Sequence, residues 1–169
     1  MSRSITRRGV LAGAAAIAGV SALPPLLAPT RSAIGHVVVD ERLTASVAFG
    51  GGFRGPDIHP VSALDDLCNR WYTRLRREVL ANGAHIAGLT SWIDYVVMRS
   101  CAAEIGYRSA FHTEHPPGAQ LWPQALGEAL AAGAHLRSRF QPARVFGATT
   151  SAVSTGHMRL VTWVFAPRN

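Results

Sequence analysis

The chain has 169 residues and a formal net charge of +7, and all 17 of its basic residues are Arg. Four of these precede residue 34, so residues 34–169 carry 13 Arg against 10 acidic residues, a net charge of +3. Such a small excess does not indicate a nucleic-acid partner. The remaining length suits one domain with a single hydrophobic core.

The first 33 residues differ in character from the rest. Arg7 and Arg8 are adjacent, and a stretch of almost only Ala and Gly follows at 12–19. This segment resembles the twin-arginine signal of bacterial exported proteins. The resemblance implies that the twin-arginine export machinery carries the folded protein to the periplasm or out of the cell. We therefore expect a signal peptide at 1–33 and a single α/β domain at 34–169.

A membrane anchor is the alternative for this segment. Its unbroken apolar run is shorter than the ~20 residues that a helical span requires. We therefore expect no stable membrane span after processing.

The domain begins with a predicted buried strand at 35–40, a β-branched apolar run. A short helix at 41–49 follows, and the three glycines at 50–52 end it. A second strand is predicted at 58–61. The glycine-rich loop follows a helix, whereas a phosphate-binding loop follows a strand, so we do not expect it to bind phosphate.

The clearest predicted helix begins at Ser62, with Asp65 completing a capping-box pattern, and ends at Asn82-Gly83. Its apolar residues recur at helical spacing and predict a buried stripe. These residues are Leu64, Leu67, Cys68, Trp71, Leu75 and Val79. Arg residues lie between them on the opposite, solvated face.

Strands and helices continue to alternate along the rest of the chain. Ser91 is the predicted N-cap of a helix, with Asp94 in its first turn. The alternation predicts a single-domain layered α/β sandwich with a mainly parallel sheet and a C-terminal antiparallel strand pair. The remaining predicted strands lie at 84–89, 107–112, 143–149 and 158–166, and the remaining helices at 92–105 and 122–132.

Cys68 and Cys101 are the two cysteines of the chain. An oxidising compartment permits a disulfide between them. Both fall on predicted helices, so two buried free thiols are the alternative. Two cysteines do not hold an iron–sulfur cluster by themselves, and we expect no cofactor.

Polar residues follow three of the predicted strands, and the carboxyl ends of parallel strands meet at one edge of a sheet, where ligands bind. His112 or His115 is the candidate general base there, and Asp40 or Glu114 the carboxylate that orients it. The candidate ligand-binding residues are Arg42, Thr90 and Ser91. The alternative is that these residues have structural roles only. Asp40 and Ser91 would then cap helices, Arg42 would pair with a neighbouring carboxylate, and the histidines would lie on the surface.

The pair His112 and His115 does not predict a metal site. Residues three apart in a strand point to opposite faces, and Pro116 prevents a helix here. The other histidines lack ligand spacing, so we predict no metal site. They are His36, His59, His85, His135 and His157.

The sequence favours an exported accessory or ligand-binding protein, with a larger exported redox protein as a candidate partner. An exposed apolar patch on the folded domain would favour this interpretation. The alternative is a small exported enzyme, hydrolase-like, that uses the strand-end cluster. A metal carrier is a third hypothesis and requires His112 and His115 to converge.

Overall fold

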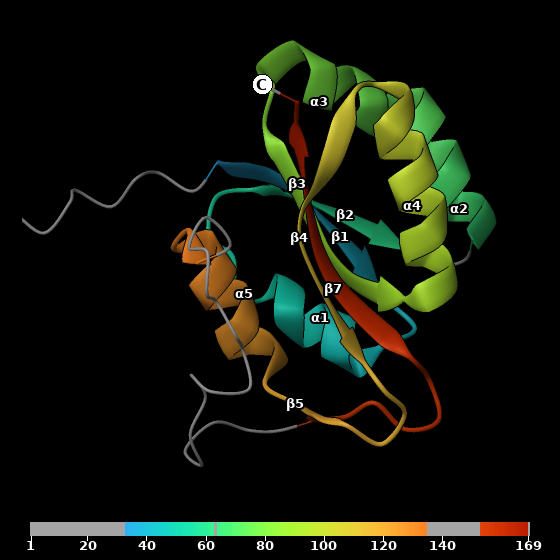
Figure 1. The fold of residues 1–169 in the computed structure, drawn as a ribbon, viewed down its shortest axis with the longest axis vertical. Helices are drawn as coiled ribbons and strands as arrows, with labels where there is room; N and C mark the ends of the chain where they lie inside the picture. The colour runs from blue at the N-terminus through green and yellow to red at the C-terminus, as the bar shows by residue number, and fades with distance from the viewer. Residues whose placement is uncertain (1–32, 63, 135–152, 169) are drawn as a thin grey trace, which may run out of the picture.

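A computed structural model describes residues 33–62, 64–134 and 153–168. They form one compact domain of three layers, a central sheet with helices on both faces (Figure 1). The predicted α/β class is confirmed. The predicted signal peptide, apart from its last residue, and the strand predicted at 143–149 lie outside the described residues.

The central sheet has the strand order β2-β1-β3-β7-β4. Strand β1 pairs in parallel with β2 and β3, whereas β7 runs antiparallel to both β3 and β4. Four strands therefore share one direction, as predicted for the first, third and fourth. The bounds are β1 Ile34–Asp40, β2 Asp57–Val61, β3 His85–Ser91, β4 Tyr107–His115 and β7 Leu160–Pro167.

The C-terminal strand is inserted within the sheet. β7 lies between β3 and β4, so the antiparallel pairing predicted for this end of the chain occurs with strands from earlier in the sequence. A separate antiparallel pair joins β5 (Gln120–Leu121) to β6 (Val153–Ser154). The insertion of β7 moves β4 one strand further from β1.

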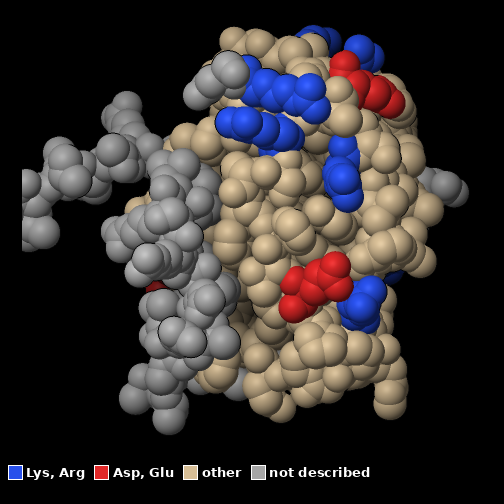
Figure 2. Space-filling model, in the orientation of Figure 1, with Lys and Arg blue, Asp and Glu red and all other residues tan. Residues whose placement is uncertain are grey.

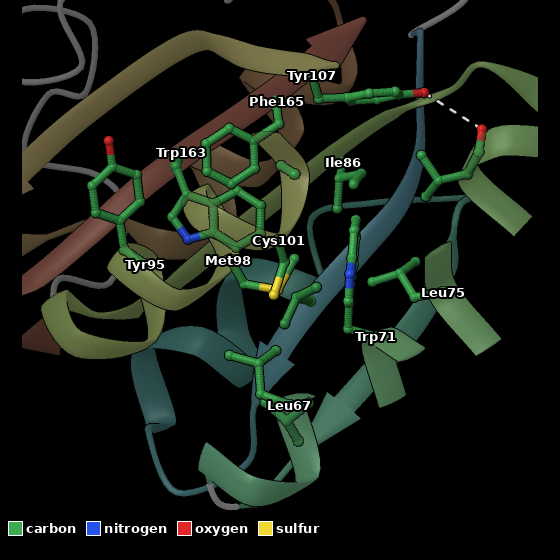
Figure 3. Close-up of a cluster of buried hydrophobic side chains, with 14 of the residues drawn as sticks. Leu67, Trp71, Leu75, Ile86, Tyr95, Met98, Cys101, Tyr107, Trp163 and Phe165 are labelled. Atoms are coloured by element: carbon green, nitrogen blue, oxygen red, sulfur yellow. Dashed lines mark hydrogen bonds between the residues drawn. The ribbon is translucent and has the colours of Figure 1, made fainter. Parts of the chain in front are cut away.

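One face of the sheet is covered by α4 (Trp92–Glu104) and by a continuous helical run. This run consists of α2 (Leu64–Arg70), the π-helical turn η1 (Trp71–Leu75) and α3 (Arg76–Asn82). Their buried side chains pack on Ile86, Trp163 and Phe165 of the sheet (Figure 3). The run ends as predicted at Gly83, which adopts φ +63° and donates its N–H to Val79.

The predicted stripe of this run is largely confirmed. Leu67, Trp71, Leu75 and Val79 are buried and Cys68 is partly buried, but Leu64, the first residue of α2, is 37% exposed. The prediction for Leu64 was wrong, because the spacing of apolar residues does not show where the helix stops packing on the sheet. Ser62 donates from its backbone N–H to Asp66 at 3.2 Å, and its hydroxyl also bonds this carboxylate.

The other face is covered by α1 (Thr44–Gly50) and α5 (Pro123–Ala131). These two short helices pack closely because glycines stand at their contact. A Cβ at Gly52 would strike the backbone of α5, and a Cβ at Gly127 would strike the carbonyl of Phe49. The second core cluster lies between these helices and the sheet.

Candidate functional site

Two polar clusters are built into the sheet, at opposite ends of its parallel strands. The first is at the carboxyl ends, where the sequence predicts a site; we call Asp40, Arg42, Ser91 and Asp94 the strand-edge cluster. Arg42 donates from Nε and Nη2 to the two Asp40 oxygens, each at 2.8 Å. Its Nη2 also donates to Asp94 Oδ2 at 3.1 Å. The end of β1 is thereby tied to the first turn of α4.

The sequence builds this junction from a helix cap. Ser91 ends β3 and is the N-cap of α4, as predicted. Its Oγ accepts from the Asp94 backbone N–H at 3.1 Å and donates to Asp94 Oδ2 at 2.8 Å. On the other side, the Asp40 backbone N–H donates to Ser46 Oγ at 2.8 Å.

Charge in the strand-edge cluster is largely balanced internally. Asp40 and Asp94 are buried, and the half-exposed Arg42 lies between them. Burial raises the pKa of Asp94, and the Asp40 charge raises it further, while Arg42 and the Ser91 hydrogen bond act against this rise. The hydrogen bond to Asp40 is the largest cause of the raised pKa of Arg42. This arrangement stabilises the junction and leaves neither carboxylate free to act as a base.

The other predicted site residues lie apart from this cluster. Thr90 is buried, donates to the Ser91 carbonyl at 3.2 Å and accepts from Trp163 Nε1 at 3.0 Å. Glu114 forms an ion pair with Arg159 at 3.4 Å. β4 is three strands from β1, so about 14 Å separates them at ~4.8 Å per strand. His112 therefore cannot reach Asp40.

The two candidate histidines of β4 face opposite sides of the sheet, as their spacing predicts. His112 stacks on Tyr95 of α4, with ring centroids 6.0 Å apart. His115 is buried, and its Nε2 shares a hydrogen bond of 2.8 Å with Thr162 Oγ1, on the face of α1 and α5. Burial lowers the pKa of His115 to about 4. A catalytic set of His112 or His115 with Asp40 and Arg42 is not assembled.

Cys68 and Cys101 are free thiols in the structure, on the neighbouring helices α2 and α4. Cys101 is buried, and this burial is the main reason that its pKa rises to about 11, with Glu104 and Cys68 adding to the effect. The structure therefore contains two unbridged thiols, but the expected burial of both is met only by Cys101, because Cys68 is partly exposed.

The second cluster lies toward the amino ends of the parallel strands, and the sequence did not predict it. We call His36, His59, Glu78 and Asn82 the histidine cluster. His36 Nδ1 lies 3.1 Å from His59 Nε2, and Glu78 Oε2 lies 4.0 Å from that same His59 atom. Asn82 Nδ2 lies 3.1 Å from His36 Nε2. Four side chains from two strands and a helix thus meet in one place.

Parallel pairing of β1 and β2 builds the histidine cluster. His59 is in register with Val38, two residues after His36, so both imidazoles face the same side of the sheet. The helix α3 crosses above them and supplies Glu78 and Asn82, one turn apart. Their separations along the sequence match no metal-binding motif. The one sequence signal was a histidine within each of two predicted buried strands.

Two polar atoms of the histidine cluster are buried without a hydrogen-bond partner among the described residues: His59 Nδ1 and Glu78 Oε2. The imidazoles of His36 and His59 are almost completely buried. Burial is the main cause that lowers the pKa of His59 to about 4, so it is neutral near pH 7. Ligand atoms of His36, His59 and Glu78 all lie within 4.8 Å of one another, close enough to hold a metal ion.

No family model, curated protein or solved structure is significantly similar to this chain. Within residues 33–62, 64–134 and 153–168, no helix is long and apolar enough to cross a membrane.

Proposed function

We propose that this chain is an exported accessory protein that binds a second protein around the first turn of α4. One observation carries the proposal: large apolar side chains are exposed beside the strand-edge cluster. Trp92, Ile93, Val96 and Met158, which we call the α4 surface, are each between 37% and 59% exposed. Exposed apolar groups gathered in one place are typical of protein-binding surfaces.

The residues of the α4 surface lie near one another. Val96 is one turn beyond Trp92 and Ile93, so the three side chains share one side of the helix. The Trp92 N–H donates to the Arg159 carbonyl at 3.1 Å, which places Met158 next to the helix start. The face over α4 is mostly uncharged, whereas acidic and basic groups lie over the strands beside it and at the upper end of the domain (Figure 2). The half-exposed Arg42 borders the surface through its contact with Asp94.

The hydrolase alternative loses its support. It requires a base, a carboxylate and an anion-binding group within hydrogen-bond reach of one another. Asp40 is engaged by Arg42, His115 by Thr162, and His112 lies on a strand about 14 Å from β1. Binding rather than catalysis therefore fits this part of the domain.

Export enters the proposal through the Arg7-Arg8 segment. Because this route carries folded proteins, a complex that assembles in the cytoplasm can be exported without coming apart. A larger exported redox protein remains the candidate partner.

A photo-crosslinking amino acid at position 93 tests the surface in cells that export the protein. We expect one adduct of defined mass. Leu80 on α3 is 55% exposed and lies outside the α4 surface, so the same amino acid at position 80 is a matched control. Absence of the adduct at 93, or the same adducts from both positions, would contradict the proposal.

Replacing both Arg7 and Arg8 by Lys tests the export route. The precursor should then stay in the cytoplasm with its N-terminal segment uncleaved. Normal processing of this double variant would rule out twin-arginine export and leave the surface proposal to be judged by crosslinking alone.

A further inference from the structure

We propose that His36, His59 and Glu78 form a binding site for a divalent transition-metal ion, with Zn²⁺ as the best fit. The site is separate from the α4 surface, toward the amino ends of the strands. Two imidazoles and one carboxylate are ligands that Zn²⁺ binds in proteins, whereas Mg²⁺ and Ca²⁺ prefer oxygen ligands alone.

The distances fit such an ion. Ligand atoms about 2.0–2.1 Å from a tetrahedral centre lie roughly 3.3 Å from one another. His36 Nδ1 and His59 Nε2 are 3.1 Å apart, close to that value. Glu78 Oε2 is 4.0 Å from His59 Nε2 and within 4.8 Å of the His36 ligand atom, so it needs to approach by up to about 1.5 Å. Glu78 is on the outer side of the cluster and has the freedom to do so.

The carboxylate is already oriented. Arg74 donates from Nε to Glu78 Oε1 at 2.7 Å, which leaves Oε2 directed at the imidazoles. That oxygen is buried and has no hydrogen-bond partner among the described residues. A buried, unpaired carboxylate oxygen costs free energy, and a cation placed between it and the imidazoles removes that cost. Arg74 then acts as an outer partner that holds the ligand in position.

Hydrogen bonds assign the proton on each imidazole. The Ala84 N–H donates to Asn82 Oδ1 at 2.9 Å, so Asn82 Nδ2 donates to His36 Nε2. His36 therefore carries its proton on Nδ1 and donates it to His59 Nε2. The proton of neutral His59 is consequently on Nδ1, and its Nε2 lone pair points into the cluster. His59 is already in the form that binds a metal.

Metal binding requires one rearrangement at His36. The ion displaces the Nδ1 proton, and the neutral ring then carries its proton on Nε2. Asn82, an exposed residue at the end of α3, turns its amide oxygen to accept that proton. This hydrogen bond from the outer nitrogen of a ligating histidine is the common one in metal sites.

The buried strands and the exposed helix side of the site have different roles. His36 and His59 are buried on strands of the sheet, while the Glu78 side chain is 28% exposed, so an ion would enter from the helix side. Three protein ligands leave a fourth coordination position for water, the pattern of zinc sites that react or exchange ligands.

Titration of the purified, chelator-treated exported protein with Zn²⁺ tests the proposal. We expect one ion bound per chain by calorimetry, and a rise of about 10 °C in the melting temperature at 100 times the dissociation constant. His59→Leu and Glu78→Gln should each weaken binding by about 100-fold or more, because loss of a direct ligand exceeds the 10–100-fold effect of an outer partner. Co²⁺ bound at the site should show visible absorption that both variants lose.

The matched controls are Glu104→Gln and His112→Gln. Glu104 is a helix carboxylate that accepts a hydrogen bond from Tyr72, and His112 is a histidine outside the cluster. Both variants should bind Zn²⁺ as the parent does. If His59→Leu does not fold, Glu78→Gln decides, because its side chain lies at the helix surface. Absence of stoichiometric binding, or binding unchanged in Glu78→Gln, would overturn the proposal.

Discussion

The two polar clusters of this domain are opposites in how their hydrogen bonds are satisfied. In the strand-edge cluster, both buried carboxylates bond the Arg42 guanidinium, and Ser91 completes the set. In the histidine cluster, His59 Nδ1 and Glu78 Oε2 are buried and unpaired among the described residues. The first resembles a finished structural junction. The second leaves a buried imidazole nitrogen and a buried carboxylate oxygen without partners among the described residues, as a ligand-binding site does before its ligand binds.

The contrast shows why burial and charge alone do not identify a binding site. Asp40 and Asp94 are about as buried as the two histidines, and Asp40 was a candidate site residue by sequence whereas His36 and His59 were not. What separates the clusters is whether the residues present satisfy one another. Buried polar atoms in native proteins are nearly always paired, so an unpaired one calls for an explanation.

Arg42→Ala should produce the largest stability loss. The substitution leaves Asp40 and Asp94 buried together without a cation. We expect it to lower the free energy of unfolding by about 2–3 kcal/mol. This is less than the ~3–5 kcal/mol lost when a fully buried ion pair is broken, because Arg42 is half exposed. The pKa of Asp94 in the folded protein is already raised above 3.8. Protonation of Asp94 therefore stabilises the folded state at low pH, and this stabilisation is lost as the pH rises. The deficit should therefore be larger at pH 7 than at pH 4 in urea unfolding. An equal deficit at both values would contradict the assignment.

Two buried histidines differ in how fully their ring nitrogens are paired, because His59 has one buried nitrogen without a partner among the described residues. His115→Leu should destabilise the protein by about 1–2 kcal/mol, because it removes the bond to Thr162 and leaves that hydroxyl buried. His59→Leu should cost less, below ~1 kcal/mol in chelator, because it removes the buried, unpaired Nδ1–H of His59 but also the Nε2 acceptor of the His36 proton. Thermal unfolding of both variants measures the difference. A larger loss for His59→Leu than for His115→Leu would mean that the His36–His59 bond outweighs the unpaired Nδ1–H.

Asn82→Asp should tighten Zn²⁺ binding by about 10-fold. One carboxylate oxygen accepts from the Ala84 N–H, as Asn82 Oδ1 now does, and the other accepts from His36 Nε2 without any rotation. Competition with a chromogenic chelator gives the affinity. Weaker binding would show that His36 does not bind the ion through Nδ1.

Arg74→Ala should have the smallest effect. Arg74 is an exposed side chain, so the unfolding midpoint should hardly change. Zn²⁺ affinity should fall by less than about 10-fold, because Glu78 loses only its outer partner. The same titration measures this change, and a loss as large as that of Glu78→Gln would assign Arg74 a more direct role.

Local features of this protein follow from its sequence because neighbouring residues carry them. Ser91 followed three residues later by Asp94 specifies a helix start, and Asn82-Gly83 specifies an end. The spacing of Leu67, Trp71 and Leu75 specifies the face that packs on the sheet. Alternation of these elements was enough to predict the α/β class.

Tertiary structure alone decided which distant residues meet. The insertion of β7 between β3 and β4 separates His112 from Asp40, and no local pattern encodes strand order. The register of β1 and β2, with α3 crossing above them, brings His36, His59 and Glu78 together. Side-chain periodicity fixes which face of an element is buried, whereas long-range packing of those faces fixes which elements become neighbours. For that reason the sequence predicted the strand-edge contacts nearest to a helix cap and missed the histidine cluster.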